Sequence, residues 1–316
     1  MGQGLALLVT GTGATSESLT HFYQVSIPTT QSLLVYVLLT GYTLLLGKTG
    51  LSSVLSSWKA VAGYAALAIA DVEANFLVVK AYNYTSITSV MLLDCFTIPV
   101  VMTLAALFLG TRFGRLHFAG VLLCLAGIAA LVLTDYSRQS GAADDNHSAK
   151  SMLYGDLLVL GGATLYGMSN VAQEFIVKGG DNARVEFLAM LGLFGTPVSA
   201  AQVYFLESSE FSSIQWSLPV VSLVVAFSLA MFSFYSLTPI LIRATSATFL
   251  NLSLLAADVY GLVVAIFLFA FRPSPMFVLS FIAIIAGIVL YNYQPPREPP
   301  RPIQDDSIDS IHADAV

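Results

Sequence analysis

Long apolar stretches dominate the sequence and restrict what it can fold into. A helix that crosses the hydrocarbon core of a bilayer needs about 20 mostly apolar residues, and ten segments satisfy that length. Their apolar runs are continuous instead of alternating, which favours helices over membrane-spanning strands. The predicted spans are Gly4–Phe22, Thr29–Gly47, Lys59–Ala81, Ser86–Leu109, Arg115–Thr134, Tyr154–Val177, Val185–Leu206, Ser217–Leu237, Ser246–Phe271 and Met276–Tyr293.

The composition excludes a soluble domain. Only 10% of the residues are charged and 56% are hydrophobic, whereas soluble domains carry about 25% charged residues. We therefore predict an all-α polytopic membrane protein embedded in the lipid bilayer. Cys95 and Cys124 both lie in apolar spans, which favours small core residues over a disulfide or a metal site. We expect no cofactor, no metal and no nucleic-acid partner.

The positions of the Lys and Arg residues predict the orientation. With both termini in the cytosol, nine of the thirteen cations lie on the cytosolic side, as the positive-inside rule requires. Residues 136–153 then form a loop in the lumen or outside the cell. Asn146 in this loop begins the triplet Asn-His-Ser, a candidate N-glycosylation site, although such triplets are also frequent by chance. Residues 294–316 are Pro-rich and then acidic, and we expect a disordered cytosolic tail.

An internal repeat divides the chain into residues 1–135 and 154–293. A shift of 160 residues superposes Thr85–Thr88 on Thr245–Thr248, Arg112 on Arg272, and the Ala-Gly-Ile at 126–128 on that at 286–288. The alternative is a coincidence among similar apolar helices. Because each half holds five predicted spans, an odd number, the second half would be inverted relative to the first. Such inverted repeats place a substrate site near the midplane. The same shift puts the counterpart of Tyr154 before Met1, so we expect a truncated first helix.

Three long motifs resemble a known family. They are DVEANFLVVKAYNYTSITSVMLLDCFTIPVV at 71–101, GDLLVLGGATLYGMSNVAQEFIVK at 155–178 and ATSATFLNLSLLAADVY at 244–260. They are similar to solute carrier family 35, subfamily F, of the drug/metabolite transporter superfamily, and the resemblance extends from about Gly2 to Tyr293. It implies ten helices in two inverted five-helix repeats and a carrier rather than a channel or an enzyme. It also suggests nucleoside- or nucleobase-like solutes. The chain departs from the family at Gln173, where two adjacent acids are usual.

The third span carries polar residues on two faces. At about 100° per residue, Asp71, Asn75 and Tyr82 share one face, and Glu73, Lys80 and Tyr84 share the other. One helix cannot turn both faces toward one cavity. We expect Lys80 and Tyr84 to face the substrate path, because a cation near the outer end suits an anionic or hydrogen-bonding solute. The alternative is that Lys80 extends to the membrane interface as an ordinary anchor.

Two further acids lie inside predicted spans. Asp94 precedes Pro99 by about one turn, and proline can leave backbone carbonyls free to line a cavity. Asp258 shares a helical stripe with Asn251, and its counterpart in the repeat lies one turn from Asp94. A charged carboxylate is costly in a dry bundle, which suits proton coupling or the binding of a cationic group. The alternative for each acid is a structural role in holding two helices together.

The sixth span has a polar stripe of Tyr166, Asn170 and Gln173. Asn170 is the best ligand candidate among them, because an amide offers both a donor and an acceptor. Glu174 and Lys178 have the spacing of an ordinary ion pair within a helix.

In the eighth span, Tyr235 and its aromatic neighbours either stack a planar ligand or pack against other helices. The candidate substrate-binding residues are Lys80, Tyr84, Asp94, Asn170, Tyr235, Asn251 and Asp258, with Asp71, Glu73, Asn75, Tyr166 and Gln173 in second rank.

The sequence therefore predicts a secondary transporter of a small organic solute that works by alternating access, in the plasma membrane or an endomembrane. No nucleotide-binding motif that would indicate a primary pump occurs in the sequence, nor any arrangement that would indicate an intramembrane enzyme. The alternative is a membrane scaffold or receptor that keeps the transporter fold without transporting. The sequence does not predict the oligomeric state.

Overall fold

The structure, a computed structural model, describes residues 1–140, 146–180, 182–208 and 214–294. Within these ranges every regular element is a helix. The elements are α1 (Gly2–Tyr23), α2 (Pro28–Thr40), α3 (Tyr42–Ser56), α4 (Trp58–Ala81), α5 (Ile87–Asp94), α6 (Thr97–Phe108), α7 (Arg115–Ser140), α8 (Asn146–Val177), α9 (Ala183–Gln202), the π-helix η1 (Val203–Glu207), α11 (Leu218–Ala244), α12 (Ala247–Leu268) and α13 (Pro275–Asn292).

Local sequence signals fix where several helices begin. Ser57, Ser86, Ser246 and Ser274 stand immediately before α4, α5, α12 and α13, and each accepts a hydrogen bond from the backbone N–H three residues on. A serine in this position satisfies a donor that the first helical turn leaves free. These caps explain why the helices begin at or next to the limits predicted from the apolar runs.

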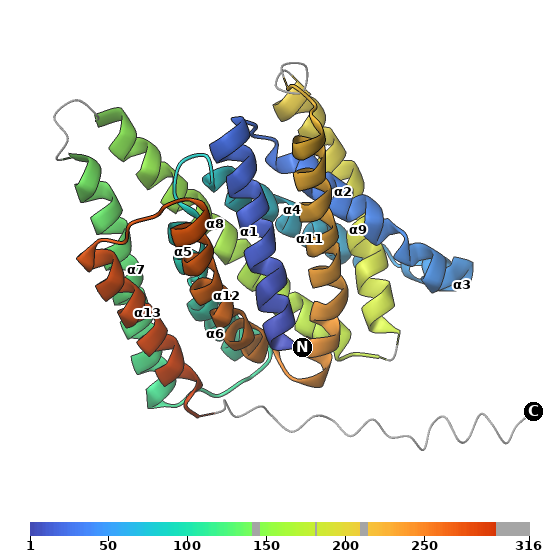
Figure 1. Cartoon of the computed structure of the whole chain (residues 1–316). Coiled ribbons are helices and arrows are strands. Elements are labelled where there is room, and N and C mark those ends of the chain that lie inside the picture. Colours follow the sequence, from blue (N-terminus) through green and yellow to red (C-terminus); the bar gives the residue numbers. More distant parts are fainter. Residues whose placement is uncertain (141–145, 181, 209–213, 295–316) are drawn as a thin grey trace, which may run out of the picture.

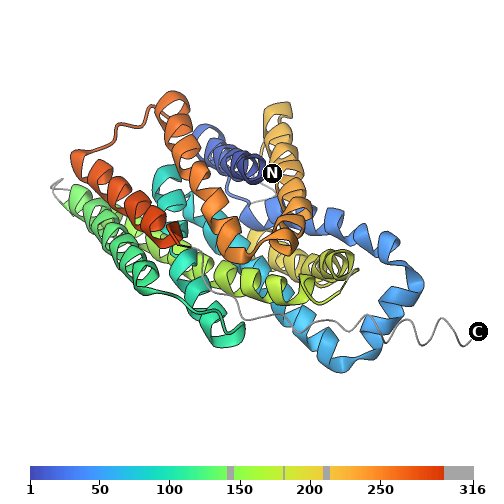
Figure 2. The same ribbon diagram turned by 90° about the horizontal axis from the view of Figure 1, so that it is seen from below.

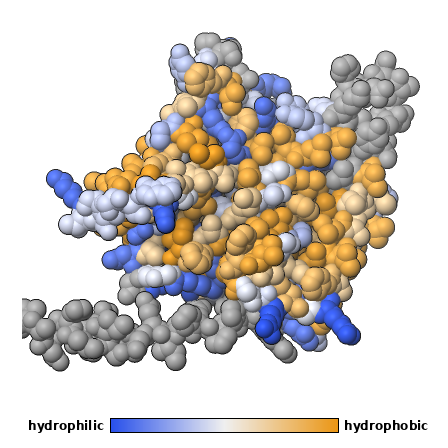
Figure 3. Space-filling view, turned by 180° about the vertical axis from the view of Figure 1, so that it is seen from behind, coloured by the Kyte–Doolittle hydropathy of each residue, from blue (hydrophilic) through white to orange (hydrophobic). Residues whose placement is uncertain are grey.

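The helices are apolar enough for a multi-pass membrane protein. In the part of the chain that the structure describes, five helical segments have the length and composition to cross a membrane, or six if α2 and α3 count as one bent span. Apolar side chains cover most of the face shown in Figure 3, and hydrophilic residues gather toward its ends. Phe175, Phe267 and Leu107 are among the exposed large side chains. A bilayer would cover such a surface.

Two predicted spans are not single straight helices. The segment predicted at Thr29–Gly47 is broken at Gly41, and α2 and α3 meet at 61°. The segment predicted at Ser86–Leu109 is interrupted at Cys95 and Phe96, between α5 and α6. The second break lies one turn before Pro99, which has no N–H to donate to the preceding turn.

The helices form one bundle with α7 and α13 at one edge and α3 at the opposite edge (Figures 1 and 2). Between these edges α4 packs mainly on α8 and α9, α2 packs on α9, and α1 packs on α11 and α12. One buried cluster joins α2, α4, α9 and α11 around Tyr36 and Phe187. A second cluster joins α5, α7, α8 and α13 around Leu93 and Ile284.

The backbones of α7 and α13 approach each other closely at glycines. A Cβ built on Gly120 would lie 2.5 Å from the carbonyl oxygen of Gly287, and one built on Gly287 would lie 2.5 Å from the backbone nitrogen of Cys124. A Cβ on Gly127 would lie 2.7 Å from Ile284 Cγ1. Small residues allow membrane helices to pack this tightly.

A shift of 160 residues relates the limits of several helices. It carries the starts of α4, α5 and α7 onto those of α11, α12 and α13, and the end of α6 onto the end of α12. It also carries Gly110 (φ 68°) onto Ala270 (φ 51°), both in the left-handed region. A non-glycine residue in this region is uncommon, so the two turns share an unusual backbone shape.

Candidate functional site

A cavity of about 1010 Å³, including its opening, lies among the helices. The side chains that line it come from α1, α4, α5, α6, α8, α9, α11 and α12, and they mix apolar and polar groups. The polar lining residues are Thr12, Asp71, Asn75, Tyr82, Asp94, Thr97, Tyr166, Ser169, Asn170, Gln173, Tyr235, Thr238 and Asn251. No Lys, Arg or His is among the described residues that line this cavity.

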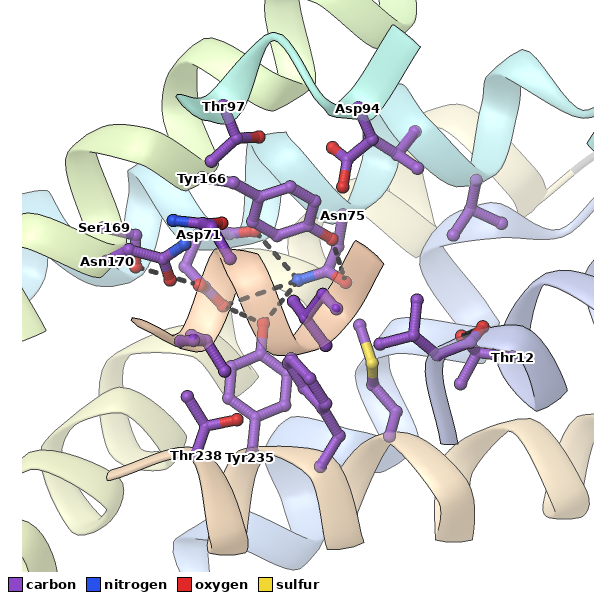
Figure 4. Close-up of a pocket in the computed structure, with 18 of the residues that line it drawn as sticks. Thr12, Asp71, Asn75, Asp94, Thr97, Tyr166, Ser169, Asn170, Tyr235 and Thr238 are labelled. Atoms are coloured by element: carbon purple, nitrogen blue, oxygen red, sulfur yellow. Dashed lines mark hydrogen bonds between the residues drawn. The ribbon is translucent and has the colours of Figure 1, made fainter. Parts of the chain in front are cut away.

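Asp71 is the centre of a hydrogen-bond network (Figure 4). Its Oδ2 accepts hydrogen bonds from the hydroxyl groups of Tyr235 at 2.5 Å and Tyr36 at 2.8 Å. Its Oδ1 accepts from Ser169 Oγ at 3.1 Å. Only 3% of Asp71 is exposed. Such a deeply buried carboxylate is tolerated because hydrogen bonds replace its hydration.

Asn75, one turn after Asp71 on α4, connects the same groups. Its Nδ2 lies 2.8 Å from the hydroxyl oxygens of both Tyr36 and Tyr235. Its Oδ1 accepts a hydrogen bond from the Tyr166 hydroxyl at 2.9 Å. The network therefore ties α4 to α2, α8 and α11 and fixes the side chains that form one wall of the cavity.

Three residues that line the cavity each carry one polar side-chain atom that is fully buried and has no hydrogen-bond partner: Asp94 Oδ1, Gln173 Nε2 and Thr238 Oγ1. They come from α5, α8 and α11. Their hydrogen-bonding capacity is not used by the protein, in contrast to that of Asp71 and Asn75.

A smaller cavity of about 460 Å³ shares Asp94 and Asn251 with the first and is also lined by Asp258. Asp258 is 7% exposed, and its Oδ2 accepts a hydrogen bond from Cys95 Sγ at 3.3 Å. The two acids thus lie at connected cavities, on α5 and α12.

The structure brings together many of the residues singled out in the sequence. Eight of them line the larger cavity: Asp71, Asn75, Asp94, Tyr166, Asn170, Gln173, Tyr235 and Asn251. Asp258 lies at the neighbouring cavity. Asn146 is the first residue of α8, and its glycosylation stays a prediction.

Lys80, Tyr84 and Glu73 lie elsewhere, because α4 turns its Asp71 face toward the cavity. The Lys80 ammonium stands 4.9 Å from the centre of the Phe76 ring, and Tyr84 packs edge to face on Tyr154. Glu73 accepts a hydrogen bond from Gln202 at 2.6 Å. Lys80 and Tyr84 are thus not among the described residues that line this cavity, and their role in the substrate path stays a prediction. Aromatic contact holds the cation at the C-terminal end of the helix instead.

The ion pair predicted between Glu174 and Lys178 is confirmed. Glu174 has a second partner that the sequence did not indicate, because its Oε2 accepts a hydrogen bond at 2.9 Å from the backbone N–H of Ala247. This contact joins the C-terminal end of α8 to the start of α12.

Sequence reasoning missed Tyr36, Ser169, Thr12 and Thr238. Tyr36 does not line the cavity but donates directly to Asp71. Ser169 lies beside the stripe of Tyr166, Asn170 and Gln173 on the same helix. Its spacing from these residues could have indicated that it faces the same site. A single tyrosine or threonine in an apolar run has no such signal. In the described residues no group of three His, Cys, Asp or Glu side chains could hold a metal ion.

Comparison with known proteins decides the family. The family profile SLC35F, described as solute carrier family 35, matches residues 1–293. The chain is 43% identical to solute carrier family 35 member F2 of Mus musculus, over 98% of this chain and 84% of that protein. It is 41% identical to the member F2 of Xenopus tropicalis, over 92% of this chain and 75% of that protein. The chain belongs to solute carrier family 35.

Membership extends beyond vertebrate relatives. An uncharacterized solute carrier family 35 member of Schizosaccharomyces pombe is 32% identical over 92% of this chain. One crystal structure of another protein superposes with a TM-score of 0.58 at 17% identity, covering 92% of this chain and 96% of that chain, which indicates a shared fold. Membership of solute carrier family 35 makes the chain a multi-pass transporter of small solutes and not an enzyme.

Proposed function

We propose that this family 35 carrier moves a planar, uncharged organic solute, nucleoside- or nucleobase-like, through the cavity around Asp71 by alternating access. The observation that carries the proposal is a cavity with apolar walls and one wall of hydrogen-bonded amide and phenol groups. Pockets that bind small molecules combine apolar walls with a few such polar groups.

Ten spans in two inverted halves are part of this proposal. It is supported by the 160-residue shift, which relates helix limits and also pairs residues of the cavity lining. The shift pairs Asn75 with Tyr235 and Met91 with Asn251, and all four line the cavity. Asn75 and Tyr235 also bond to each other, as expected for equivalent residues near a two-fold axis.

The packing of the helices supports a particular division into moving parts. α4 packs on α8, and its counterpart α11 packs on α1. Since α1 and α8 are the first helices of the two halves, each half contributes its first helix to the other half. In the mechanism we propose, the group that contains α4 and α8 and the group that contains α1 and α11 rock against each other around the cavity. Both termini lie in the cytosol.

The lining chemistry supports an uncharged solute over an anionic one. Asp71 and Asp94 line the cavity, and no cation does so among the described lining residues. A phosphate would meet two carboxylates without a Lys or Arg to compensate its charge. Amide and tyrosine groups instead suit a neutral heterocycle, since amides read both donors and acceptors and aromatic rings stack on planar groups.

The test is uptake of radiolabelled solutes into proteoliposomes that contain the full chain. The panel comprises nucleosides, nucleobases and nucleotide sugars. We expect saturable uptake of one or more nucleosides or nucleobases and none of the nucleotide sugars. If folded protein takes up nothing on the panel, the proposed solute class is wrong, and the scaffold or receptor alternative gains support.

A further inference from the structure

Four of the described residues that line the large cavity carry an amide side chain: Asn75, Asn170, Gln173 and Asn251. An amide holds an acceptor oxygen and a donor nitrogen side by side, so it can pair with a solute at two points. It can do so only where both atoms are accessible and free of other partners. The surroundings of the four amides therefore decide which of them can read a solute.

Three of the four amides do not offer both atoms. The nitrogen and the oxygen of Asn75 are already hydrogen-bonded to tyrosine hydroxyl groups. The Asn251 nitrogen donates to the carbonyl oxygen of Ala247 at 2.9 Å, which leaves only its oxygen. The Gln173 nitrogen is fully buried, so a solute in the cavity does not reach it.

Asn170 is the amide that offers both atoms. It is partly exposed, neither of its amide atoms is fully buried, and no group in the described part of the chain forms a hydrogen bond with them. Its neighbour Ser169 on α8 donates to Asp71, and Figure 4 shows Ser169 and Asn170 next to each other at one side of the cavity. The network around Asp71 thus ends at Ser169 and leaves Asn170 unoccupied.

An aromatic ring stands close to this free amide. Tyr166 precedes Asn170 by one turn of α8, so the two side chains are neighbours on the helix surface. The Tyr166 hydroxyl donates to Asn75 Oδ1 at 2.9 Å, which fixes the ring. A planar solute therefore meets an aromatic surface and a two-point hydrogen-bonding group on the same helix.

We propose that Asn170 is the residue that determines which heterocycle the carrier accepts. Its amide pairs with an edge of the solute that carries one donor and one acceptor side by side, such as a ring N–H next to a carbonyl. Asparagine makes two-point contacts of this kind with the edges of nucleobases. This inference rests on the proposed function and names the chemical edge that the site reads.

The experiment compares nucleosides with analogues that lack only the donor of this edge. The pairs are inosine with 1-methylinosine and uridine with 3-methyluridine, in which a methyl group replaces the ring N–H. Purified full-length protein is titrated with each compound in a thermal-shift assay, and each is tested as a competitor of nucleoside uptake into proteoliposomes. We expect wild-type protein to bind the unmethylated member of at least one pair about tenfold more tightly.

Asn170→Leu removes both amide atoms and keeps a side chain of similar shape. Affinity for the unmethylated nucleoside should fall about tenfold, and affinity for its methylated analogue should change by less than about twofold. Because no hydrogen bond within the protein is lost, Tm should not fall. Asn170→Ala is the second variant and gives the same expected change in preference without a bulky side chain.

Asn182→Leu is the matched control. Asn182 is exposed before the start of α9, and its side chain does not cap that helix. The same chemical change at this position should leave the preference of the wild-type protein intact.

The outcomes separate this inference from the proposed function. If wild-type protein takes up nucleosides but does not distinguish the members of either pair, the role of Asn170 is wrong and the solute class stands. The role is also wrong if both Asn170 variants keep the wild-type preference, or if they lose affinity for both members of a pair equally. Wild-type protein that takes up no member of the panel overturns the solute class as well.

Discussion

Asp71 and Asp94 line the same cavity but have different surroundings. Two tyrosines and a serine donate to Asp71, whereas Asp94 Oδ1 has no partner. The same chemical change, from a carboxylate to an amide, should therefore have opposite effects on stability at the two positions.

Asp71→Asn is expected to destabilise the protein. An amide oxygen in the place of Oδ2 still accepts from Tyr36 and Tyr235 but carries no charge, and the amide nitrogen in the place of Oδ1 cannot accept from Ser169. Hydrogen bonds to a charged group contribute about 1.5–3 kcal/mol each, more than bonds to a neutral one. A clear fall in Tm and a loss of at least tenfold in uptake should result, measured by thermal unfolding in detergent and by proteoliposome assay. An unchanged Tm would show that the network does not stabilise the fold.

Asp94→Asn is expected to leave Tm unchanged or to raise it. The substitution removes a negative charge that is costly inside a membrane bundle and breaks none of the hydrogen bonds around Asp71. Thermal unfolding is measured for this variant and for Asp71→Asn, and the two changes in Tm are compared because both variants replace Asp by Asn. A fall in Tm as large as that of Asp71→Asn would contradict the lower hydrogen-bonding load of Asp94, whose Oδ1 has no partner.

The sequence predicted which residue types would gather at the site but not which face of α4 would turn inward. Polar residues occur on both faces, and Lys80 was favoured because it is charged. A charge near a helix end can remain at the interface, so its presence does not indicate a cavity. Asn75 and Tyr235 were both candidates from the sequence, and the 160-residue shift also pairs them with each other.

At the scale of elements, the α7–α13 contact depends on the absence of side chains. The predicted limits of these two helices followed from their apolar runs, and their starts agree with the structure. Their close approach was not predicted, because a glycine in an apolar run does not identify its partner helix. The break at Gly41 was missed for a similar reason, since hydropathy does not change at a bend. The break at Cys95–Phe96 lies one turn before Pro99, where the sequence indicated a disturbed helix.

Gly287→Ala is expected to loosen this contact. The new methyl group would lie 2.5 Å from the Cys124 nitrogen and 2.6 Å from the Gly120 oxygen, so the two backbones would have to separate. We expect a lower Tm and a lower yield of monodisperse protein by size-exclusion chromatography.

Gly11→Ala in α1 is the matched control, because a Cβ there meets nothing within 4 Å. Alanine also has a higher helix propensity than glycine, by about 1 kcal/mol. This variant should keep or raise Tm. Equal losses in both variants would mean that the effect is not due to the α7–α13 contact.

At the scale of the whole molecule, the predicted orientation places the start of α8 outside the cytosol. We expect Asn146 to carry an N-linked glycan when the chain is made in eukaryotic cells. Asn146→Gln should then abolish the mobility shift that glycosidase treatment produces on a gel.

Asn83 provides the control, because it begins a second triplet, Asn-Tyr-Thr, on the same predicted side of the membrane. Its amide nitrogen donates to Ser26 at 2.5 Å, and its amide oxygen accepts from Thr20 at 3.2 Å. Both polar groups of the Asn83 side chain are therefore hydrogen-bonded within the folded protein. Asn83→Gln should leave the glycan in place. A shift that survives Asn146→Gln would contradict the predicted use of Asn146.

The packing of α1 on helices from the far end of the sequence has a consequence for how the chain is made. α1 packs mainly on α11 and α12, which are separated from it in the sequence by most of the polypeptide. Under the proposed ten-span topology, α1 enters the membrane during synthesis without its final neighbours and remains so until the ribosome has produced α11. Its Thr and Ser hydroxyls bond largely to carbonyls of its own helix, as Thr15 does to Gly11 and Ser18 to Ala14. Self-contained hydrogen bonds of this kind allow a helix rich in hydroxyl groups to persist among lipids before its partners arrive.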